Sequence, residues 1–310
     1  MAGLTALIPL DGTKLSEHSY EMLPLLKLLG FDKIRVVTVW ESAWEEAETG
    51  RDMKELSEIT EKGRNYLSAY VDQQKERIQA AGFEVEALVH VGRPADEVLQ
   101  AAEGVDLVLI ATHGRTGIAR WWLGSVADQV IKDSKCPTLV VGPNVEADLA
   151  TYKVNRILVP LDGSEMAEHA LPVAVWIAKL TGAELDIVRC MSLTAVTYDP
   201  SMSMYSADLI TSMEDAVREY LRQVADRVKG VKFTTTMIMG SAGETLLERM
   251  KDVKSDLVIT TSHGRTGVTR AALGSVTDRL LHGSAPVLVF RPSEVAAGGL
   301  ITAAEAATVS

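Results

Sequence analysis

The feature that most limits how this chain can fold is an internal repeat with a period of about 150 residues. The run ALIPLDG at 6–12 returns as ILVPLDG at 157–163, and HGRTG at 113–117 returns at 263–267. The first pair is offset by 151 residues and the second by 150. Offsets that agree across so much chain indicate that a whole domain is duplicated. The 310 residues are enough for two domains of about 150 residues each.

Each copy alternates short apolar runs with helical stretches. In the first copy, the predicted strands are Leu4–Pro9, Ile34–Val39, Glu84–Val89, Asp106–Ala111 and Pro137–Val141, and the predicted helices lie near 14–29, 52–81, 95–103 and 122–133. In the second copy, the predicted strands lie near 155–160, 185–190, 232–238, 256–261 and 286–290.

Mostly continuous apolar strands that alternate with helices favour a parallel sheet covered on both faces. Right-handed crossovers then give a doubly wound sheet with a ligand crevice at the carboxyl ends of its strands. The sequence therefore predicts an α/β protein of two tandem doubly wound domains, each with a five-stranded parallel sheet.

The predicted domain boundaries follow from the repeat and from composition. Domain 1 is predicted at 1–143 and domain 2 at 154–293. Residues 144–153, with a Gly-Pro turn before them and several charges, are the expected linker. The tail at 294–310 is rich in small residues, and we expect it to be loosely attached or to form a terminal helix.

Charge and cysteine content exclude several classes of protein. The net charge of −11 argues against nucleic-acid binding, which depends on lysine and arginine at phosphates. The two cysteines, Cys136 and Cys190, form no CxxC motif, so a disulfide scaffold or zinc ribbon is not expected. The chain shows no signal-peptide pattern and no apolar run of membrane-spanning length. We expect a cytoplasmic protein without membrane contact.

A glycine-rich loop follows the fourth predicted strand of each copy. Gly114 and Gly264 come directly after the strand and its His, and a Gly-Ser pair follows nine residues later, at 124–125 and 274–275. Glycine lets the backbone approach a ligand closely. The Gly-Ser pair opens a helix, whose free N–H groups favour an anion. The pattern predicts a phosphate-binding loop.

The same Gly-Ser pair also has a purely structural interpretation. A serine that caps a helix stabilises it by about 1 kcal/mol without any ligand. Two copies at identical spacing favour the phosphate site over Ser125 and Ser275 acting only as caps.

The order of these motifs resembles the universal stress protein family. The resemblance rests on PLDG at the end of the first strand, a G-2x-G-9x-G-(S/T)-type loop after the fourth, and the closing strands PTLVV and PVLVF. It covers residues 4–143 and 154–292. It implies two domains of the adenine nucleotide α-hydrolase-like, universal stress protein type.

The resemblance also implies an adenine-nucleotide site, with ATP as the cofactor, with or without Mg²⁺. Base and ribose contacts carried over to this sequence are Pro9, Asp11 and Val39 in the first copy, and Pro160, Asp162 and Cys190 in the second. Phosphate contacts are Ala111, Gly114, Gly124, Ser125 and Val126 in the first copy, and Thr261, Gly264, Gly274, Ser275 and Val276 in the second.

The first glycine of the family's loop is replaced in both copies, by Ala111 and Thr261. A Cβ at this position crowds a phosphate or ribose, and threonine resists a positive φ. A negative φ there would tolerate both residues. We expect the first copy to be the better nucleotide site.

No enzyme motif accompanies the loop. The sequence has no G-x-x-x-x-G-K-[ST] and no G-x-S-x-G, so we expect a binding protein rather than an enzyme, with at most slow ATP hydrolysis. We predict a stress-response protein whose conformation or association depends on the nucleotide. The alternative is a scaffold for dimerisation and partner binding that takes no nucleotide. A hydrolase of the adenine nucleotide α-hydrolase type is a third, weaker hypothesis.

Association is expected to involve the closing strands, because an uncovered apolar sheet edge promotes pairing. The resemblance implies that the two copies pair through these strands inside one chain and that chains then form homodimers.

Residues 191–212, rich in Met, Ser and Tyr, are predicted to form a mobile flap near the second crevice. The repeated His113 and His263 are expected to order their loops rather than to bind a metal.

Overall fold

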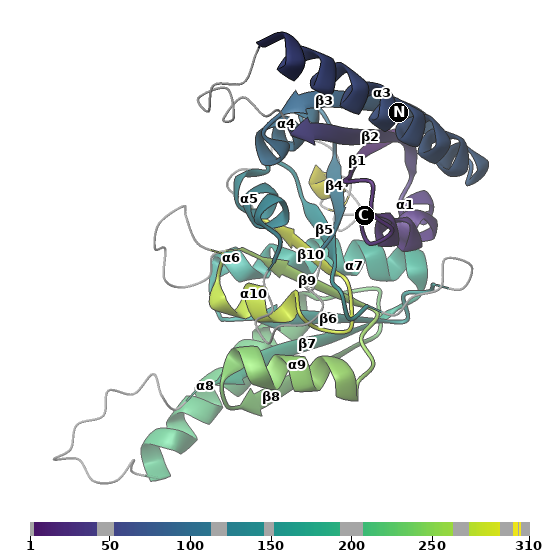
Figure 1. Ribbon diagram of the computed structural model, residues 1–310. Helices are drawn as coiled ribbons and strands as arrows, with labels where there is room; N and C mark the ends of the chain where they lie inside the picture. The colour runs from purple at the N-terminus through teal and green to yellow at the C-terminus, as the bar shows by residue number, and fades with distance from the viewer. Residues whose placement is uncertain are drawn as a thin grey trace, which may run out of the picture. The chain divides into compact units, whose positions relative to one another are not determined.

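The computed structural model describes residues 3–41, 53–112, 123–145, 152–192, 207–262, 273–291, 300–302 and 304, with 53–60 and 207–208 described by their backbone alone. The chain folds into two compact units, whose main bodies are Met1–Pro143 and Lys153–Ser293. We call these units copy one and copy two (Figure 1). The HGRTG segments and the Trp121-Trp122 pair lie outside the described residues.

Copy one contains, in chain order, β1 (Leu4–Leu10), the 3₁₀ helix η1 (Ser16–Met22), α1 (Leu23–Leu28), β2 (Phe31–Glu41), α3 (Met53–Ala80), β3 (Glu84–Gly92), α4 (Pro94–Ala101), β4 (Leu107–Ala111), α5 (Ser125–Asp133) and β5 (Thr138–Val141). Copy two contains β6 (Arg156–Leu161), α6 (Glu165–Glu168), α7 (Ala170–Thr181), β7 (Glu184–Met191), α8 (Ala207–Arg227), β8 (Phe233–Met239), α9 (Ala242–Asp252), β9 (Leu257–Thr261), α10 (Ser275–Leu280) and β10 (Val287–Phe290).

Both copies confirm the predicted fold class. The strands of copy one lie in the order β3-β2-β1-β4-β5, and each adjacent pair is parallel. The strands of copy two lie in the equivalent order β8-β7-β6-β9-β10, again in parallel pairs. Strand order reverses between β1 and β4 and between β6 and β9, which is where a doubly wound sheet forms its ligand crevice.

Helices connect the parallel strands, and the right hand of these crossovers decides which face of the sheet each helix covers. In copy one this places α1 and α3 on one face and α4 and α5 on the other, and α4 packs against α5 (Figure 1). In copy two α9 packs against α10 in the same way. The central strands are buried along nearly their whole length and supply aliphatic cores.

The helical stretch predicted near 14–29 is confirmed, but it is not one continuous α-helix. The segment begins as η1 and changes to α1 at Leu23, with Pro24 in the first turn of α1. Proline suits a first turn but breaks a helix interior, so one continuous α-helix is disfavoured. The hydroxyls of Ser16 and Ser19 donate to the carbonyls of Thr13 and Ser16 (both 2.8 Å), which favours the tighter winding.

One further prediction needs correction, and a second can be narrowed. Of the predicted flap at 191–212, Met191 ends β7 and residues 207–212 begin α8, while 193–206 lie outside the described residues. The helix α8 therefore begins inside the segment whose Met-rich composition had predicted a flap. Of the two expectations for the tail, the terminal helix agrees with the described residues, because 300–302 are helical and Leu300 and Ala304 are buried.

One ion pair anchors the long helix of each copy to the segment after the first strand. Arg77 on α3 bonds the Glu17 carboxylate at 2.6 Å, and Arg227 on α8 bonds Glu168 at 2.7 Å. Tyr70 on α3 also donates to Glu17 Oε1 at 3.2 Å. Burial and the Glu17 charge raise the pKa of Tyr70, which keeps its hydroxyl protonated as a donor.

Among the described helices, none is long and apolar enough to cross a membrane.

Candidate functional site

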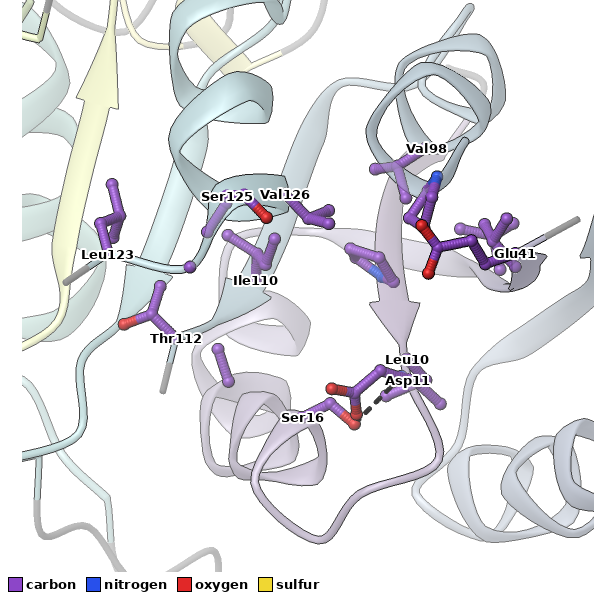
Figure 2. Close-up of a pocket in the computed structure, with 17 residues that line it drawn as sticks. Leu10, Asp11, Ser16, Glu41, Val98, Ile110, Thr112, Leu123, Ser125 and Val126 are labelled. Carbon is purple, nitrogen blue, oxygen red and sulfur yellow. Dashed lines mark hydrogen bonds between the residues drawn. The ribbon is translucent and has the colours of Figure 1, made fainter. Parts of the chain in front are cut away.

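A cavity of about 700 Å³ opens at the carboxyl ends of the copy-one strands, at the point where strand order reverses. This volume is typical of small-molecule sites. We call the cavity crevice one (Figure 2). Its described lining is Pro9, Leu10, Asp11, Ser16, Val37, Val39, Glu41, Pro94, Val98, Ile110, Ala111, Thr112, Leu123, Gly124, Ser125, Val126 and Ala127.

Every described residue of the predicted copy-one site lines crevice one, and Gly114 lies outside the described residues. Sequence reasoning missed Glu41, Pro94 and Val98, which form the side of the crevice nearest β3 and α4. Strand β2 continues two residues past its predicted end, and this extension brings Glu41 to the crevice (Figure 2). The sequence could have indicated Pro94 and Val98, because α4 begins directly after β3. The end of β3 lies at the same edge of the sheet as the crevice.

The aspartate after the first strand forms a turn in both copies. The backbone N–H and the hydroxyl of Thr13 donate to Asp11 Oδ1 at 2.9 and 2.6 Å. The backbone N–H and the hydroxyl of Ser164 donate to Asp162 Oδ1 at 2.9 and 2.5 Å. The local turn role of these aspartates is therefore present, and it also fixes each carboxylate at the rim of a crevice.

Gly12 and Gly163 make the same turn possible. Their φ angles are +81° and +80°, in the left-handed region that glycine adopts most readily. The turn holds the backbone of Asp11 beside Ser16, where the Asp11 N–H donates to Ser16 Oγ at 3.4 Å (Figure 2).

The helix after the glycine-rich loop starts differently from the capping hypothesis. Gly124 is the N-cap of α5 and Ser125 is the first helical residue; Gly274 and Ser275 take the same places at α10. The interpretation of the serines as caps is therefore wrong. Glycine supplies no side chain to bond the first N–H groups. In crevice one these N–H groups belong to a helix of nine residues whose first three residues line the cavity.

The replaced glycines of the loop do not strain the backbone. Ala111 and Thr261 are the last residues of β4 and β9 and have extended strand conformations. Their parallel partners are Val141 and Phe290. The negative-φ alternative is the one observed, and both residues are tolerated. Both residues line the crevice of their own copy.

A smaller cavity of about 250 Å³ lies at the equivalent place in copy two, and we call it crevice two. Its described lining is Pro160, Leu161, Asp162, Ala167, Arg189, Cys190, Ala242, Leu246, Thr260, Thr261, Gly274, Ser275, Val276 and Thr277. All described residues of the predicted copy-two site belong to it, and Gly264 lies outside the described residues. Sequence reasoning missed Arg189, Ala242 and Leu246.

Strand register settles which residues correspond in the two copies. Leu10 pairs with Thr38, and Leu161 pairs with Arg189. Val39 and Cys190, each one residue further on, are therefore equivalent. Burial raises the pKa of the Cys190 thiol, so it is protonated at neutral pH.

The two crevices differ in charge. The described lining of crevice one has two carboxylates, Asp11 and Glu41, and no lysine or arginine. The described lining of crevice two contains one carboxylate, Asp162, and one guanidinium, Arg189. In crevice one the carboxylates lie at the ends of β1 and β2, away from the α5 N-terminus (Figure 2). The cavity is therefore acceptor-rich at one end and offers N–H groups at the other.

The described residues offer no metal centre, since no group of three or more His, Cys, Asp or Glu side chains gathers among them in a way that could hold a metal ion. His18 lies 3.7 Å from Glu21, and His169 Nδ1 bonds the Glu165 carbonyl at 2.9 Å. These repeated histidines serve local contacts.

The chain is similar to known proteins both in sequence and in fold. A family model described as the universal stress protein family matches residues 5–142 and 153–291. A universal stress protein of Mycobacterium bovis is 27% identical over 235 residues, covering 75% of this chain and 78% of that protein. One of Mycobacterium tuberculosis gives the same figures. The crystal structure of a universal stress protein from Archaeoglobus fulgidus, 23% identical, covers 94% of this chain and 99% of its own with a TM-score of 0.67, which shows the shared fold.

Proposed function

The chain belongs to the universal stress protein family, with two such domains in tandem, and from this premise we propose that it binds ATP in crevice one. The observation that carries the proposal is the start of α5. A glycine N-cap and a helix N-terminus face a cavity of about 700 Å³ whose other end holds Asp11.

The polarity of crevice one supports a nucleotide bound in one direction. The α5 N–H groups attract the phosphates through hydrogen bonds and the helix dipole. The hydroxyls of a ribose are donors, and they match the Asp11 carboxylate at the β1 end. Apolar side chains of Val39, Val98 and Ile110 line the space between and suit the faces of a purine.

The proposed role of the nucleotide is to control conformation or association in a stress response. We propose that the protein is a binder rather than an enzyme, because the described lining offers no nucleophile–base pair. We also propose domain boundaries at 143 and 154 and pairing of the two copies through their last strands. The chain is further proposed to form a homodimer and to be located in the cytoplasm. Mg²⁺ would accompany ATP and offset the negative charge of its phosphates.

The alternative remains a scaffold that binds partners without nucleotide. The small volume and the arginine of crevice two favour it for copy two. No comparable observation favours it for copy one.

Calorimetric titration of the full chain with ATP–Mg²⁺ tests the proposal. The informative variant is Gly124→Val. Gly124 has φ −57° and ψ 144°, which any residue adopts, and a Cβ there meets no atom within 4 Å. The variant should therefore fold normally while its side chain enters the phosphate end of the crevice. We expect the affinity for ATP to fall by at least about tenfold, or about 1.4 kcal/mol.

Gly274→Val is the matched control. Its backbone angles are −58° and 140°, and a Cβ there would be 3.9 Å from the Thr277 hydroxyl. We expect it to leave ATP affinity unchanged. A wild-type chain that releases no heat and shows no thermal shift with ATP would support the scaffold instead.

A further inference from the structure

We propose that Arg189 closes crevice two to nucleotides, so that one chain takes one nucleotide. The inference rests on the proposed function of crevice one and names the residue that makes the two copies unequal. It concerns selectivity within the duplicated site.

The position of Arg189 follows from strand register. It pairs with Leu161 at the end of β6, as Thr38 pairs with Leu10 at the end of β1. Thr38 is 1% exposed and does not line crevice one. The long side chain of Arg189 instead reaches crevice two and is part of its lining.

The guanidinium lies over the turn that follows β6. Arg189 NH1 donates to the Leu161 carbonyl at 3.4 Å. Its NH2 lies 3.3 Å from the place that a Cβ on Gly163 would take. Asp162 is part of this turn, so Arg189 lies beside it in crevice two. The equivalent place in crevice one, next to Asp11, is part of the cavity.

An aromatic ring also lies near the guanidinium. The centre of the Arg189 guanidinium is 6.0 Å from the centroid of the Tyr220 ring on α8. The Glu168–Arg227 ion pair holds this part of α8 against the segment after β6. The arginine is thus supported by the carbonyl, the turn and the ring together, rather than extending freely into water.

Size and chemistry then act in the same direction. Crevice two has about 250 Å³ where crevice one has about 700 Å³. Thr261 and Leu246 are also larger than their copy-one counterparts Ala111 and Val98. Within the described linings, Arg189 is the change that adds a charged side chain. A guanidinium carries donors and no acceptor. It therefore cannot accept a hydrogen bond from a ribose hydroxyl, whereas the Asp11 carboxylate of crevice one can.

Native mass spectrometry of the full chain with ATP–Mg²⁺ tests the proposal by counting nucleotides. The variant is Arg189→Thr, which installs the residue of copy one. We expect one nucleotide per wild-type chain and two per Arg189→Thr chain. Arg218→Thr removes the same charge from the exposed face of α8, where Arg218 lies 3.6 Å from Glu214, and should keep one.

Alkylation of Cys190 gives a second readout. The chain has two cysteines, of which Cys190 lines crevice two and Cys136 lies outside both described linings. Saturating ATP should leave the alkylation rate of Cys190 unchanged in the wild type and lower it at least about tenfold in Arg189→Thr. Cys136 is the internal reference in each experiment. This comparison of rates with and without ATP cancels any effect of Arg189 on the thiol itself.

The outcomes separate the two proposals. Two nucleotides per wild-type chain, or protection of wild-type Cys190 by ATP, would overturn the role of Arg189 and leave ATP binding intact. One nucleotide in folded Arg189→Thr would do the same. No nucleotide on the wild-type chain would instead remove the proposed function on which this inference rests.

Discussion

The backbone conformation of crevice one closely matches that of crevice two, but the side chains that line the two crevices differ. The aspartate turns have the same hydrogen bonds, and the N-cap glycines have nearly the same angles, −57° and 144° against −58° and 140°. The cavities nevertheless measure about 700 and 250 Å³. Side chains at strand ends face a crevice rather than a core, so they change at little cost to the fold and determine what each crevice accepts.

The sheets of the two copies show a second difference at one register position. Arg35 on β2 and Asp186 on β7 pair with Leu7 and Leu158, which are equivalent. Arg35 bonds Glu86 and two backbone carbonyls near the surface. Asp186, 1% exposed, accepts a two-point contact from Arg249 at 2.8 and 3.1 Å. At this register position copy two therefore carries a buried charge that depends on its partner, whereas the Arg35 side chain of copy one is partly exposed.

The largest effect is expected from Asp186→Ala. Removing one partner of a buried pair leaves the other uncompensated, which costs about 3–5 kcal/mol. The Arg249 side chain keeps 27% exposure, so we expect a loss near 3 kcal/mol. Urea denaturation measures it. A loss no greater than that of Glu86→Ala in copy one would show that the two sheet networks are equivalent after all.

A smaller effect, on binding, is expected from Ser125→Asp. An acidic residue at the first position of α5 stabilises the helix by about 0.3–1 kcal/mol but repels a phosphate at the same place. We expect ATP affinity to fall about tenfold while the melting temperature stays level or rises. Ser275→Asp makes the same change at α10 and should not alter affinity. Equal losses for both variants would mean that both crevices bind ATP.

The smallest effect is expected from Glu86→Gln. The Arg35 hydrogen bond holds the pKa of Glu86 below its usual range. The folded pKa is thus lower than the unfolded pKa of about 4.3, so the contribution is complete above that pH and is lost as pH falls through the folded value. We expect a difference below about 1 kcal/mol, because the pair is partly exposed. Urea midpoints measured from pH 7 downward should converge for variant and wild type in acid; a difference that persists there would require another cause.

Much of the fold was predictable because its signal is local. Each strand is a short apolar or alternating run, and the repeat shows each one twice. The aspartate turns and the glycine loops follow directly from strand ends, so the edge of the sheet that carries the site was predictable as well. The described members of the predicted site do line the two crevices.

The rest depends on contacts between distant segments. The direction of the Arg189 side chain depends on Tyr220, which lies on the following helix, and on the carbonyl of Leu161 on the neighbouring strand. The choice between glycine and serine as N-cap is a one-residue difference in where a helix begins, which composition cannot fix. The role of Glu41 required the extra length of β2. The residues of the repeated ion pairs recur at offsets of 151 for the glutamates and 150 for the arginines, but the sequence does not show that they meet until the helices are placed.

The most direct test of nucleotide binding in crevice one is photolabelling with an azido-adenine analogue of ATP, followed by peptide mapping. We expect the label on peptides from the ends of β2 and β3 and the start of α4, which contain Val39, Glu41 and Val98. Excess ATP should prevent the labelling, and Gly124→Val should reduce it. Equal labelling of the peptide that contains Cys190, or labelling that ATP does not displace, would contradict the account.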